Sequence, residues 1–198
     1  MKDVLILLDN GHGENTKGKC SPDERIKEWE YTREISNKVY TTLKELGYDV
    51  ILVTPEKTDV SLKTRIKRVN KYHKLHGNSI LISIHLNAAG NGNNWMDANG
   101  ACVYVSNNAS AKSKLLAKSF YTKIEQLDMC GNRYVPKCKY WIKSLAICRE
   151  TNCPAILTET MFMDNKKDVE FLLSEKGKEK VVEAHVEGII NYIKSCQK

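Results

Sequence analysis

The chain has 198 residues, of which 41% are hydrophobic and 28% charged, and it carries a formal net charge of +7. This composition favours a globular protein with one sizeable core, and it excludes a disordered chain and, because no apolar run approaches roughly 18 residues, stable membrane insertion. The lysines are scattered rather than gathered in a basic block, and no nucleic-acid-binding motif is present, so we expect no nucleic-acid partner.

Short apolar runs alternate with amphipathic segments of helical period along the chain. In chain order, the predicted elements are a strand over Val4–Leu8, a helix over Glu28–Leu46, a strand over Val50–Val53, a helix over Leu62–Leu75, strands over Ile80–Ile84 and Ala101–Val105, a helix over Lys112–Leu127, strands over Leu145–Arg149 and Pro154–Thr158, and helices over Asp168–Leu173 and Glu179–Ile193. This alternation predicts a single α/β domain over residues 1–198, in which helices flank both faces of a mostly parallel sheet to give three layers.

The cysteines and the N-terminus bear on where the protein is made. The seven cysteines form an odd set without a C-x-x-C pair, so we expect reduced thiols, with Cys102 and Cys148 buried and the others near the surface. Lys2 and Asp3 precede an apolar run that is too short for a signal peptide. We therefore expect synthesis in the cytosol and later release, for example through a holin or by lysis, or direct action outside if the natural N-terminus is longer.

Residues that can bind a metal follow three of the predicted strands. His12 lies in the stretch DNGHG after the first strand, His85 follows the third, and Glu159 follows the last, while Glu28 begins the first helix. In α/β sheets, functional groups gather at the carboxyl ends of the strands. Two histidines and a carboxylate are a common ligand set for catalytic zinc, and a second carboxylate is the general base that a metal hydrolase needs. The alternative is that both histidines are loop residues that bond to backbone groups.

Five stretches carry a resemblance to a known family. In order, they are DNGHG at 9–13, KEWEYTREISNKVYTTLKELGYDV at 27–50, VSLKTRIKRVN at 60–70, SIHLNA at 83–88 and ILTETMFMDN at 156–165. Together they resemble the zinc-dependent N-acetylmuramoyl-L-alanine amidases that act on peptidoglycan, a type also found in phage endolysins. The resemblance runs from about Val4 to Ile193. The chain departs from it at Asn10, where the family usually has proline or alanine, which affects loop conformation rather than ligand chemistry.

The resemblance implies a twisted sheet of about six strands and a site with defined roles. One zinc ion per chain is implied, held by His12, Glu28 and His85. Glu159 is implied as the catalytic carboxylate, which takes a proton from water and delivers it to the departing amine.

The identity of the third ligand is the most open part of this set. The ligand glutamate of the family lies about four residues before the apolar face of the first helix, which favours Glu28. Glu30 and Glu24 are the nearby competitors.

The activity implied by the resemblance is hydrolysis of the amide between the lactyl group of N-acetylmuramic acid and L-alanine. Two alternatives use the same fold: a zinc peptidase that cuts within the stem peptide, and a catalytically inactive wall-binding module. Peptidoglycan is then the expected partner, and we expect a monomer. A phage or prophage lysin is the expected origin, with a bacterial enzyme as the rival.

Four further residues are candidate substrate contacts. Asn87 either orients the substrate or forms a turn. Arg133, Tyr140 and Trp141 belong to an aromatic and basic stretch that either contacts stem-peptide carboxylates and sugar faces or packs as an ordinary loop. Arg65, on the second predicted helix, is expected to pair with an acidic neighbour.

Overall fold

The computed structural model describes residues 4–197, so Lys2 and Asp3, on which the expectation about the N-terminus rests, lie outside it. The described chain folds around a six-stranded sheet with the order β2-β1-β3-β6-β4-β5. The strands are β1 (Leu5–Asn10), β2 (Val50–Leu52), β3 (Ser79–Asn87), β4 (Cys102–Val105), β5 (Trp141–Ile142) and β6 (Ala155–Phe162). The helices are α1 (Glu28–Glu45), α2 (Leu62–His76), α3 (Ala111–Gln126), α4 (Ala146–Arg149), α5 (Lys166–Leu173) and α6 (Glu175–Ser195).

The centre of the sheet is parallel, and one edge departs from this rule. β1 pairs in parallel with β2 and β3, and β3 pairs in parallel with β6. β4 is antiparallel to β6, and the short β5 is parallel to β4. The predicted mostly parallel sheet of about six strands is therefore confirmed. All six residues of β1 are buried, because a central parallel strand is covered on both faces, and this is why it has a nearly continuous apolar sequence.

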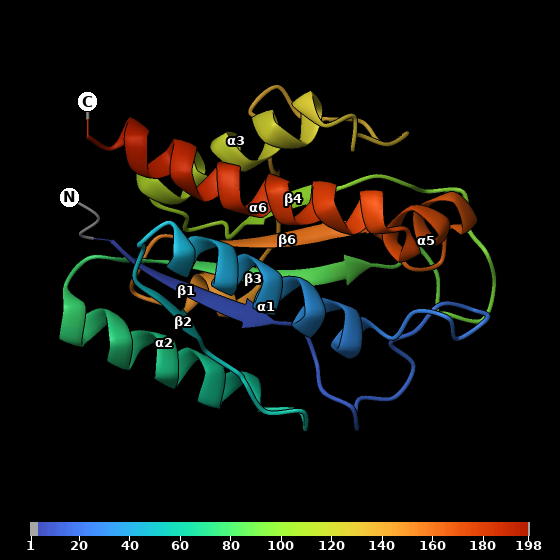
Figure 1. Cartoon of the computed structure of the whole chain (residues 1–198), viewed down its shortest axis with the longest axis horizontal. Helices are drawn as coiled ribbons and strands as arrows, with labels where there is room; N and C mark the ends of the chain where they lie inside the picture. Colours follow the sequence, from blue (N-terminus) through green and yellow to red (C-terminus); the bar gives the residue numbers. More distant parts are fainter. Residues whose placement is uncertain (1–3, 198) are drawn as a thin grey trace.

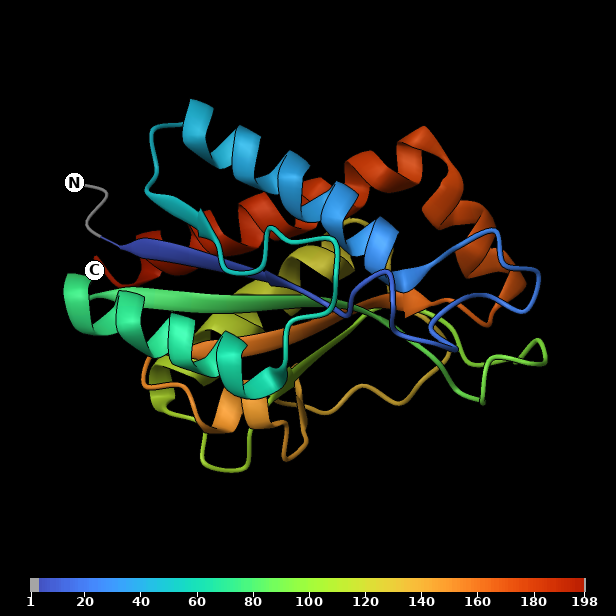
Figure 2. The same cartoon turned by 90° about the horizontal axis from the view of Figure 1, so that it is seen from below.

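Helices cover both faces of the sheet, which gives three layers (Figure 1). Figure 2 shows α1 and α6 on one side of the sheet and α2 on the other. Side chains such as Ile6 and Ile82 face the larger core, which α1, α3 and α6 complete. Their strand neighbours Leu7 and Leu81 face the smaller core beneath α2 and α4. Successive residues of each central strand thus enter opposite cores.

One predicted element is wrong. The segment Leu145–Arg149 is not a strand but contains the short helix α4. The backbone amides of Cys148 and Arg149 both donate to the carbonyl of Leu145, which closes a helical turn. A five-residue segment with four apolar residues is too short for its periodicity to separate a strand from a helix. The sixth strand is instead β5, whose two residues are too few to show any period.

Several elements extend beyond their predicted ends, and three of these extensions are β3, β6 and α6. β3 and β6 continue far enough to include His85 and Glu159, so both side chains are held by the sheet rather than by loops. α6 begins at Glu175 rather than Glu179, and Ser174 is its N-cap. The extension of the two strands matters most, because it places both chemically active side chains on rigid backbone.

All seven cysteines are free, as expected. Cys102 and Cys148 are buried, but the expectation that the other thiols lie near the surface is wrong for Cys153. Cys153 directly precedes Pro154 and β6, and it packs in the smaller core. The polar residues before it in the sequence gave no indication that it is buried. Within residues 4–197, no helix combines the length and apolar character that a bilayer span requires.

Candidate metal centre

The three expected metal ligands converge at the carboxyl ends of β1 and β3. His12 lies just after β1, His85 lies in β3, and Glu28 is the first residue of α1. One potential ligand atom from each residue lies within 4.8 Å of the other two. The competitors Glu24 and Glu30 are exposed, and neither joins this group among the residues that the structure describes.

Glu28 lies at the centre of this group. Its Oε1 accepts a hydrogen bond from the backbone amide of Leu86 at 3.0 Å and lies 3.0 Å from Nδ1 of His85. Its Oε2 lies 3.4 Å from Nε2 of His12. The two imidazole rings meet edge to face, with centroids 5.3 Å apart. The three side chains therefore direct nitrogen and oxygen donors into one small volume.

The pKa shifts of Glu28 and His12 favour the deprotonated forms that bind a metal, whereas that of His85 does not. Burial acts to raise the pKa of Glu28, but its hydrogen bond to His85 and the charges of both histidines lower it overall. Burial lowers the pKa of His12 and so favours its neutral imidazole. Burial also acts to lower the pKa of His85, but the hydrogen bond to Glu28 raises it overall. Metal ligands must be deprotonated, so a metal ion would compete with a proton at His85.

The glycines of DNGHG make room for neighbours of His12. A Cβ atom at Gly11 would lie 2.6 Å from Nδ1 of His85, and one at Gly13 would lie 2.0 Å from the backbone nitrogen of Asp59. His12 itself has a φ of 59°, in the left-handed region. The stretch therefore combines two close approaches with one unusual backbone conformation, which is why a histidine stands between two glycines at a strand end.

Contacts within the loop before α1 fix the position of Glu28 in the cluster. The backbone amide of Glu28 donates to the carbonyl of Lys19 at 2.9 Å, and Cys20 forms an isolated antiparallel bridge with Lys27. α1 has no side-chain N-cap. The loop carbonyl therefore satisfies the first amide of the helix and fixes where the helix begins.

Glu159 lies beside the cluster in the sheet. It pairs with His85 of β3 on one side and with Cys102 of β4 on the other. Its Oε2 atom is buried and has no hydrogen-bond partner among the described residues. Burial raises the pKa of Glu159 to about 7, with the charge of Glu28 acting in the same direction. A buried carboxyl group with a pKa near neutrality is suited to proton transfer.

A β-bulge follows Glu159 in β6. The register pairs His85 with Glu159 but Asn87 with Phe162, so β6 contains one extra residue between these pairs. Met161 lies in this bulge with a φ of 110°. Bulges next to active sites change the direction in which neighbouring side chains point. The register is therefore interrupted immediately beyond Glu159 and resumes at Phe162.

Two of the expected substrate contacts lie together near Glu159. The Nη1 group of Arg133 donates to Sγ of Cys102 at 3.0 Å and to the hydroxyl of Tyr104 at 3.1 Å. Its guanidinium group lies over the ring of Trp141, 5.5 Å from the centroid. Because Cys102 is paired with Glu159, this cation and this aromatic ring stand on the part of the sheet that adjoins the cluster.

Asn87 and Tyr140, the other two expected substrate contacts, lie in different surroundings. Asn87 ends β3 and accepts a hydrogen bond from the amide of Ala88, while its Nδ2 group is buried without a partner within residues 4–197. This amide retains an unused donor on the same strand as His85. Tyr140 packs against the larger core. Within the described range, the structure gives no contact between its side chain and the three potential ligands or Glu159. The structure therefore does not bring Tyr140 into the site.

Sequence reasoning missed two lysines near the site. The positive charges of Lys19 and Lys143 both lower the pKa of Glu159, and Lys19 also lowers the pKa of His12. Lys19 belongs to the loop before α1, and Lys143 follows β5. No short motif joins two such distant segments, so only the fold shows that the charges of both lysines act on the same carboxyl group.

The expected pairing of Arg65 with an acidic neighbour is confirmed. Its guanidinium group lies 2.8 Å from Oδ1 of Asp9 and 2.9 Å from Oδ1 of Asp59. Asp9 is 1% exposed and also accepts hydrogen bonds from the hydroxyls of Thr54 and Ser83. This buried network holds the end of β1, and thus the start of DNGHG, against α2.

The donor set fits a divalent cation such as zinc. Two imidazoles and one carboxylate leave a fourth coordination position open, as in catalytic zinc sites. The Leu86 amide fixes the orientation of the Glu28 carboxylate, which is the kind of support that metal ligands receive from neighbouring groups. Glu159, which is paired with His85 in the sheet, carries a further carboxylate with one unpaired oxygen.

Comparisons with known proteins agree over nearly the whole chain. The model of the N-acetylmuramoyl-L-alanine amidase family matches residues 6–191. The chain is 28% identical over 192 residues to the endolysin of Bacillus phage SPP1 and 25% identical over 193 residues to the probable cell wall amidase LytH of Staphylococcus saprophyticus. These alignments cover 93% and 97% of this chain but only 64% and 59% of the two relatives. The chain thus spans less than two thirds of either relative.

Solved structures share the fold. The N-acetylmuramoyl-L-alanine amidase of Clostridium difficile 630 superposes with a TM-score of 0.83 at 26% identity, covering 98% of this chain and 99% of that one. The amidase Ami1 of Mycobacterium smegmatis gives a TM-score of 0.84 over 97% of both chains, at an identity of 18% that bears on the fold alone. With the family model matched from the first strand to the last helix, the chain belongs to the N-acetylmuramoyl-L-alanine amidase family.

Proposed function

We propose that the chain is a zinc hydrolase that cleaves the amide bond between the lactyl group of N-acetylmuramic acid and L-alanine in peptidoglycan. The observation that carries the proposal is the joint placement of three potential ligands and one unpaired buried carboxyl group at one end of the sheet. Membership of the amidase family and the printed names of the relatives support the choice of bond.

His12, Glu28 and His85 are the residues that would hold zinc, one ion per chain. Zinc, when bound, supplies Lewis acidity, which makes water more acidic and an amide carbonyl more electrophilic. The protein's part is to present two neutral imidazoles and a carboxylate at fixed positions. The Leu86 amide orients Glu28, and the close contact with Gly11 limits movement of the His85 ring.

Glu159 is the proposed general base and acid. The residue is partly exposed and makes no hydrogen bond through Oε2 within the described chain, so its carboxyl group can accept a proton from the attacking water. The same carboxyl group then donates the proton to the departing amine, since an amine anion is a very poor leaving group. A pKa of about 7 allows both transfers near neutral pH.

The substrate contacts follow from the groups around Glu159. Arg133 and Trp141 offer a cation and an aromatic face on the adjoining part of the sheet. Asn87 offers an amide donor that has no partner in the described chain. Lys19 and Lys143 add positive charge near the carboxyl group, which suits a peptide that carries carboxylates.

The proposed partner is peptidoglycan, reached after release from the cell that makes the protein. The names of the relatives include a phage endolysin and cell wall amidases, which supports a lysin or a cell-wall enzyme. All four proposed site residues come from one chain, so the reaction needs no second copy and a monomer suffices.

A defined substrate tests this function against the zinc peptidase and the inactive binding module. Zinc-loaded protein would be incubated with N-acetylmuramoyl-L-alanyl-D-isoglutamine, and the products identified by mass spectrometry. Release of intact N-acetylmuramic acid and the dipeptide is the expected result. Cleavage between the two amino acids would identify a peptidase instead. If neither bond is cut in this compound or in longer muropeptides, the inactive binding module is the better description.

A further inference from the structure

We propose that Arg33 and Arg65 are positioning residues that hold the backbone carbonyl of His12 and thereby aim its imidazole at the metal site. This inference rests on the zinc site of the proposed function, but not on which bond the enzyme cuts. The two guanidinium groups come from different helices and meet at a single carbonyl group. Neither arginine contributes a ligand atom to the three-residue cluster.

His12 needs an external support for its conformation. Its φ of 59° places it in the left-handed region, which is disfavoured for residues with a Cβ atom. Backbone hydrogen bonds hold the flanking glycines, Gly11 to the carbonyl of Ile84 and Gly13 to the hydroxyl of Thr16, so the carbonyl of His12 is the remaining point at which the loop can be held. A change of this backbone conformation would turn the imidazole away from Glu28, whose Oε2 now lies 3.4 Å from Nε2 of His12.

The carbonyl oxygen of His12 accepts two charged hydrogen bonds. The Nη2 group of Arg33 donates to it at 3.0 Å, and the Nη2 group of Arg65 donates to it at 3.2 Å. A carbonyl oxygen has two lone pairs, so these donors use its full capacity. Because the carbonyl direction depends on the local backbone torsions, fixing it fixes the conformation of the loop at His12.

Arg33 ties His12 to the helix that carries Glu28. Its Nη1 group donates to the carbonyl of Trp29, one turn earlier in α1, at 2.9 Å. Its Nε and Nη2 groups donate to the carbonyl of Glu56 at 3.0 and 2.7 Å. The guanidinium group is therefore fixed by α1 on one side and by the loop after β2 on the other. It sets the distance between two of the proposed ligands.

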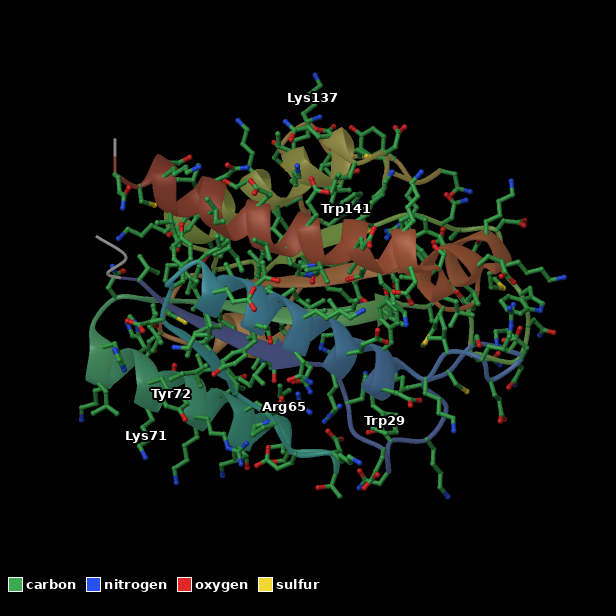
Figure 3. The ribbon with its side chains drawn as sticks, viewed as in Figure 1. Trp29, Arg65, Lys71, Tyr72, Lys137 and Trp141 are labelled. Carbon is green, nitrogen blue, oxygen red and sulfur yellow. The ribbon has the colours of Figure 1, made fainter. Side chains whose placement is uncertain are left out.

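Arg65 ties the same carbonyl to the end of β1. It is 5% exposed and bonds to Asp9, to Asp59 and to the carbonyl of Asn10, as well as to His12. In Figure 3, Arg65 lies at the end of α2 nearest to the carboxyl end of β1. The two carboxylates compensate its charge, so a guanidinium group can stay buried beside the loop.

The convergence of two like charges needs such compensation. Burial lowers the pKa of Arg33, and the charge of Arg65 lowers it further, while Asp59 and Asp9 oppose this effect. The two guanidinium groups repel each other, so they do not attract each other to this place. Both lie there because each donates a hydrogen bond to the carbonyl oxygen of His12.

Arg68 provides a matched control. It lies on α2 one turn after Arg65 and donates to the carbonyl of Val53 at 2.9 Å and to the carboxylate of Glu56. It therefore supports the same loop after β2 as Arg33 does. The structure gives no hydrogen bond between Arg68 and His12 within residues 4–197. Loss of Arg68 should disturb that loop without releasing the His12 carbonyl.

The test is the zinc affinity of purified protein without any substrate. Dissociation constants would be measured by competition with a chromophoric chelator for the wild type, Arg33→Gln, Arg33→Lys and Arg68→Gln, together with the Tm of each metal-free protein. Arg33→Gln should bind zinc about tenfold more weakly, as expected for loss of a group that supports a ligand. Arg33→Lys, which keeps one donor, should recover part of the affinity. Arg68→Gln should bind zinc as the wild type does.

A second readout separates positioning from general stability. The visible spectrum of the cobalt-substituted protein reports ligand geometry, and it should change in Arg33→Gln but not in Arg68→Gln. Equal zinc affinities and cobalt spectra for wild type and Arg33→Gln would overturn the inference. A loss of affinity in Arg68→Gln equal to that in Arg33→Gln would also overturn it, because the effect would then come from the loop. If the wild type binds no zinc, the proposed zinc site fails together with this inference, whereas an inactive wild type that binds zinc leaves the inference intact.

The contribution of Arg65 is tested by Arg65→Lys, which keeps the buried charge but not the forked donor. It should weaken zinc binding in the same assay, and affinity equal to the wild type would remove Arg65 from the proposed role. Because Arg65 belongs to a buried ion pair, its variant must first show a cooperative unfolding transition. If it does not fold, the Arg33 variants decide the matter, since Arg33 is only partly buried.

Discussion

His85 and Glu159 are paired residues on the neighbouring parallel strands β3 and β6. Both strands continue through these positions, so a proposed ligand and the proposed general base are set side by side by the hydrogen-bond register of the sheet. The register also fixes Glu159 against Cys102 on its other side. The relative placement of His85 and Glu159 thus depends on strand pairing rather than on the conformation of a loop.

Glu159→Gln should retain zinc and the fold but lose turnover by roughly a hundredfold or more, because a glutamine cannot accept or deliver the proton. Zinc content, Tm and the rate on the muramoyl peptide would be measured together. Glu179→Gln, on the exposed surface of α6, is the control and should match the wild type. Activity of Glu159→Gln within a few fold of the wild type would exclude Glu159 from its proposed role.

Glu28→Gln should lower the zinc affinity strongly, because the variant replaces a charged ligand inside the cluster. Glu30→Gln should leave the affinity unchanged, since Glu30 is exposed and lies outside the cluster. Zinc bound after exhaustive dialysis would be quantified by metal analysis for both variants. The reverse pattern, with zinc lost in Glu30→Gln alone, would identify Glu30 as the third ligand.

Gly11→Ala should weaken zinc binding, because the new Cβ atom would lie 2.6 Å from Nδ1 of His85 and must displace the ring. Gly90→Ala is a suitable control, since its Cβ atom would lie 3.3 Å from the flexible side chain of Met96 and at an ordinary contact distance of 3.6 Å from Oδ2 of Asp164. Chelator competition on both variants measures the difference. An unchanged zinc affinity for Gly11→Ala would show that His85 does not need its present position to bind the metal.

Arg133→Gln should raise KM for muramoyl peptides several fold and leave the zinc content unchanged, if the cation contacts the substrate. Lys137→Gln is the control, because Lys137 is exposed and projects from the molecule (Figure 3). Trp141, whose ring Arg133 contacts, lies closer to the sheet in the same view. Steady-state kinetics of both variants would be compared. A fall in kcat at unchanged KM would instead assign Arg133 to support of the sheet around Glu159.

His185 should make the metal-free protein less stable in acid. This residue of α6 is 3% exposed, and burial lowers its pKa from 6.5 to about 4. As the pH falls below 6.5, the unfolded chain takes up a proton that the folded chain excludes, so the free energy of unfolding decreases until about pH 4. The expected loss from this group between pH 7 and pH 5 is about 2 kcal/mol.

The measurement is urea unfolding at both pH values, with a chelator present, for the wild type and His185→Gln. The variant should lose less stability between pH 7 and pH 5 than the wild type, whatever its stability at pH 7. His76→Gln, on the exposed end of α2, should retain the pH dependence of the wild type. An identical pH dependence in wild type and His185→Gln would contradict the assignment.

Much of the fold followed from the sequence because the central strands are strongly marked. β1 and β3 are apolar runs of strand length, and the helices α1 and α2 show a clear period. α4 and β5 were missed because four and two residues cannot show a period. The early end predicted for β6 had another cause, since polar residues such as Glu159 look like loop when only local sequence is considered.

The site was predictable to a different degree for each residue. His12, His85 and Glu159 are candidates that the sequence alone predicts, because functional groups gather at strand ends. Glu28 was chosen over Glu30 through the family resemblance, and the structure places Glu28 alone of the two in the cluster. The contact of Gly11 with the His85 ring was beyond sequence reasoning, as were the bonds of Arg33 to His12, because they join segments far apart in the chain.

The most direct test of the proposed function is a digest of purified peptidoglycan with zinc-loaded protein. Newly released L-alanine amino termini would be counted against newly formed reducing sugar ends, with Glu159→Gln as the inactive control. The proposal predicts new L-alanine termini in the wild-type digest without new reducing ends. New amino termini from other residues, or new reducing ends without L-alanine termini, would contradict it.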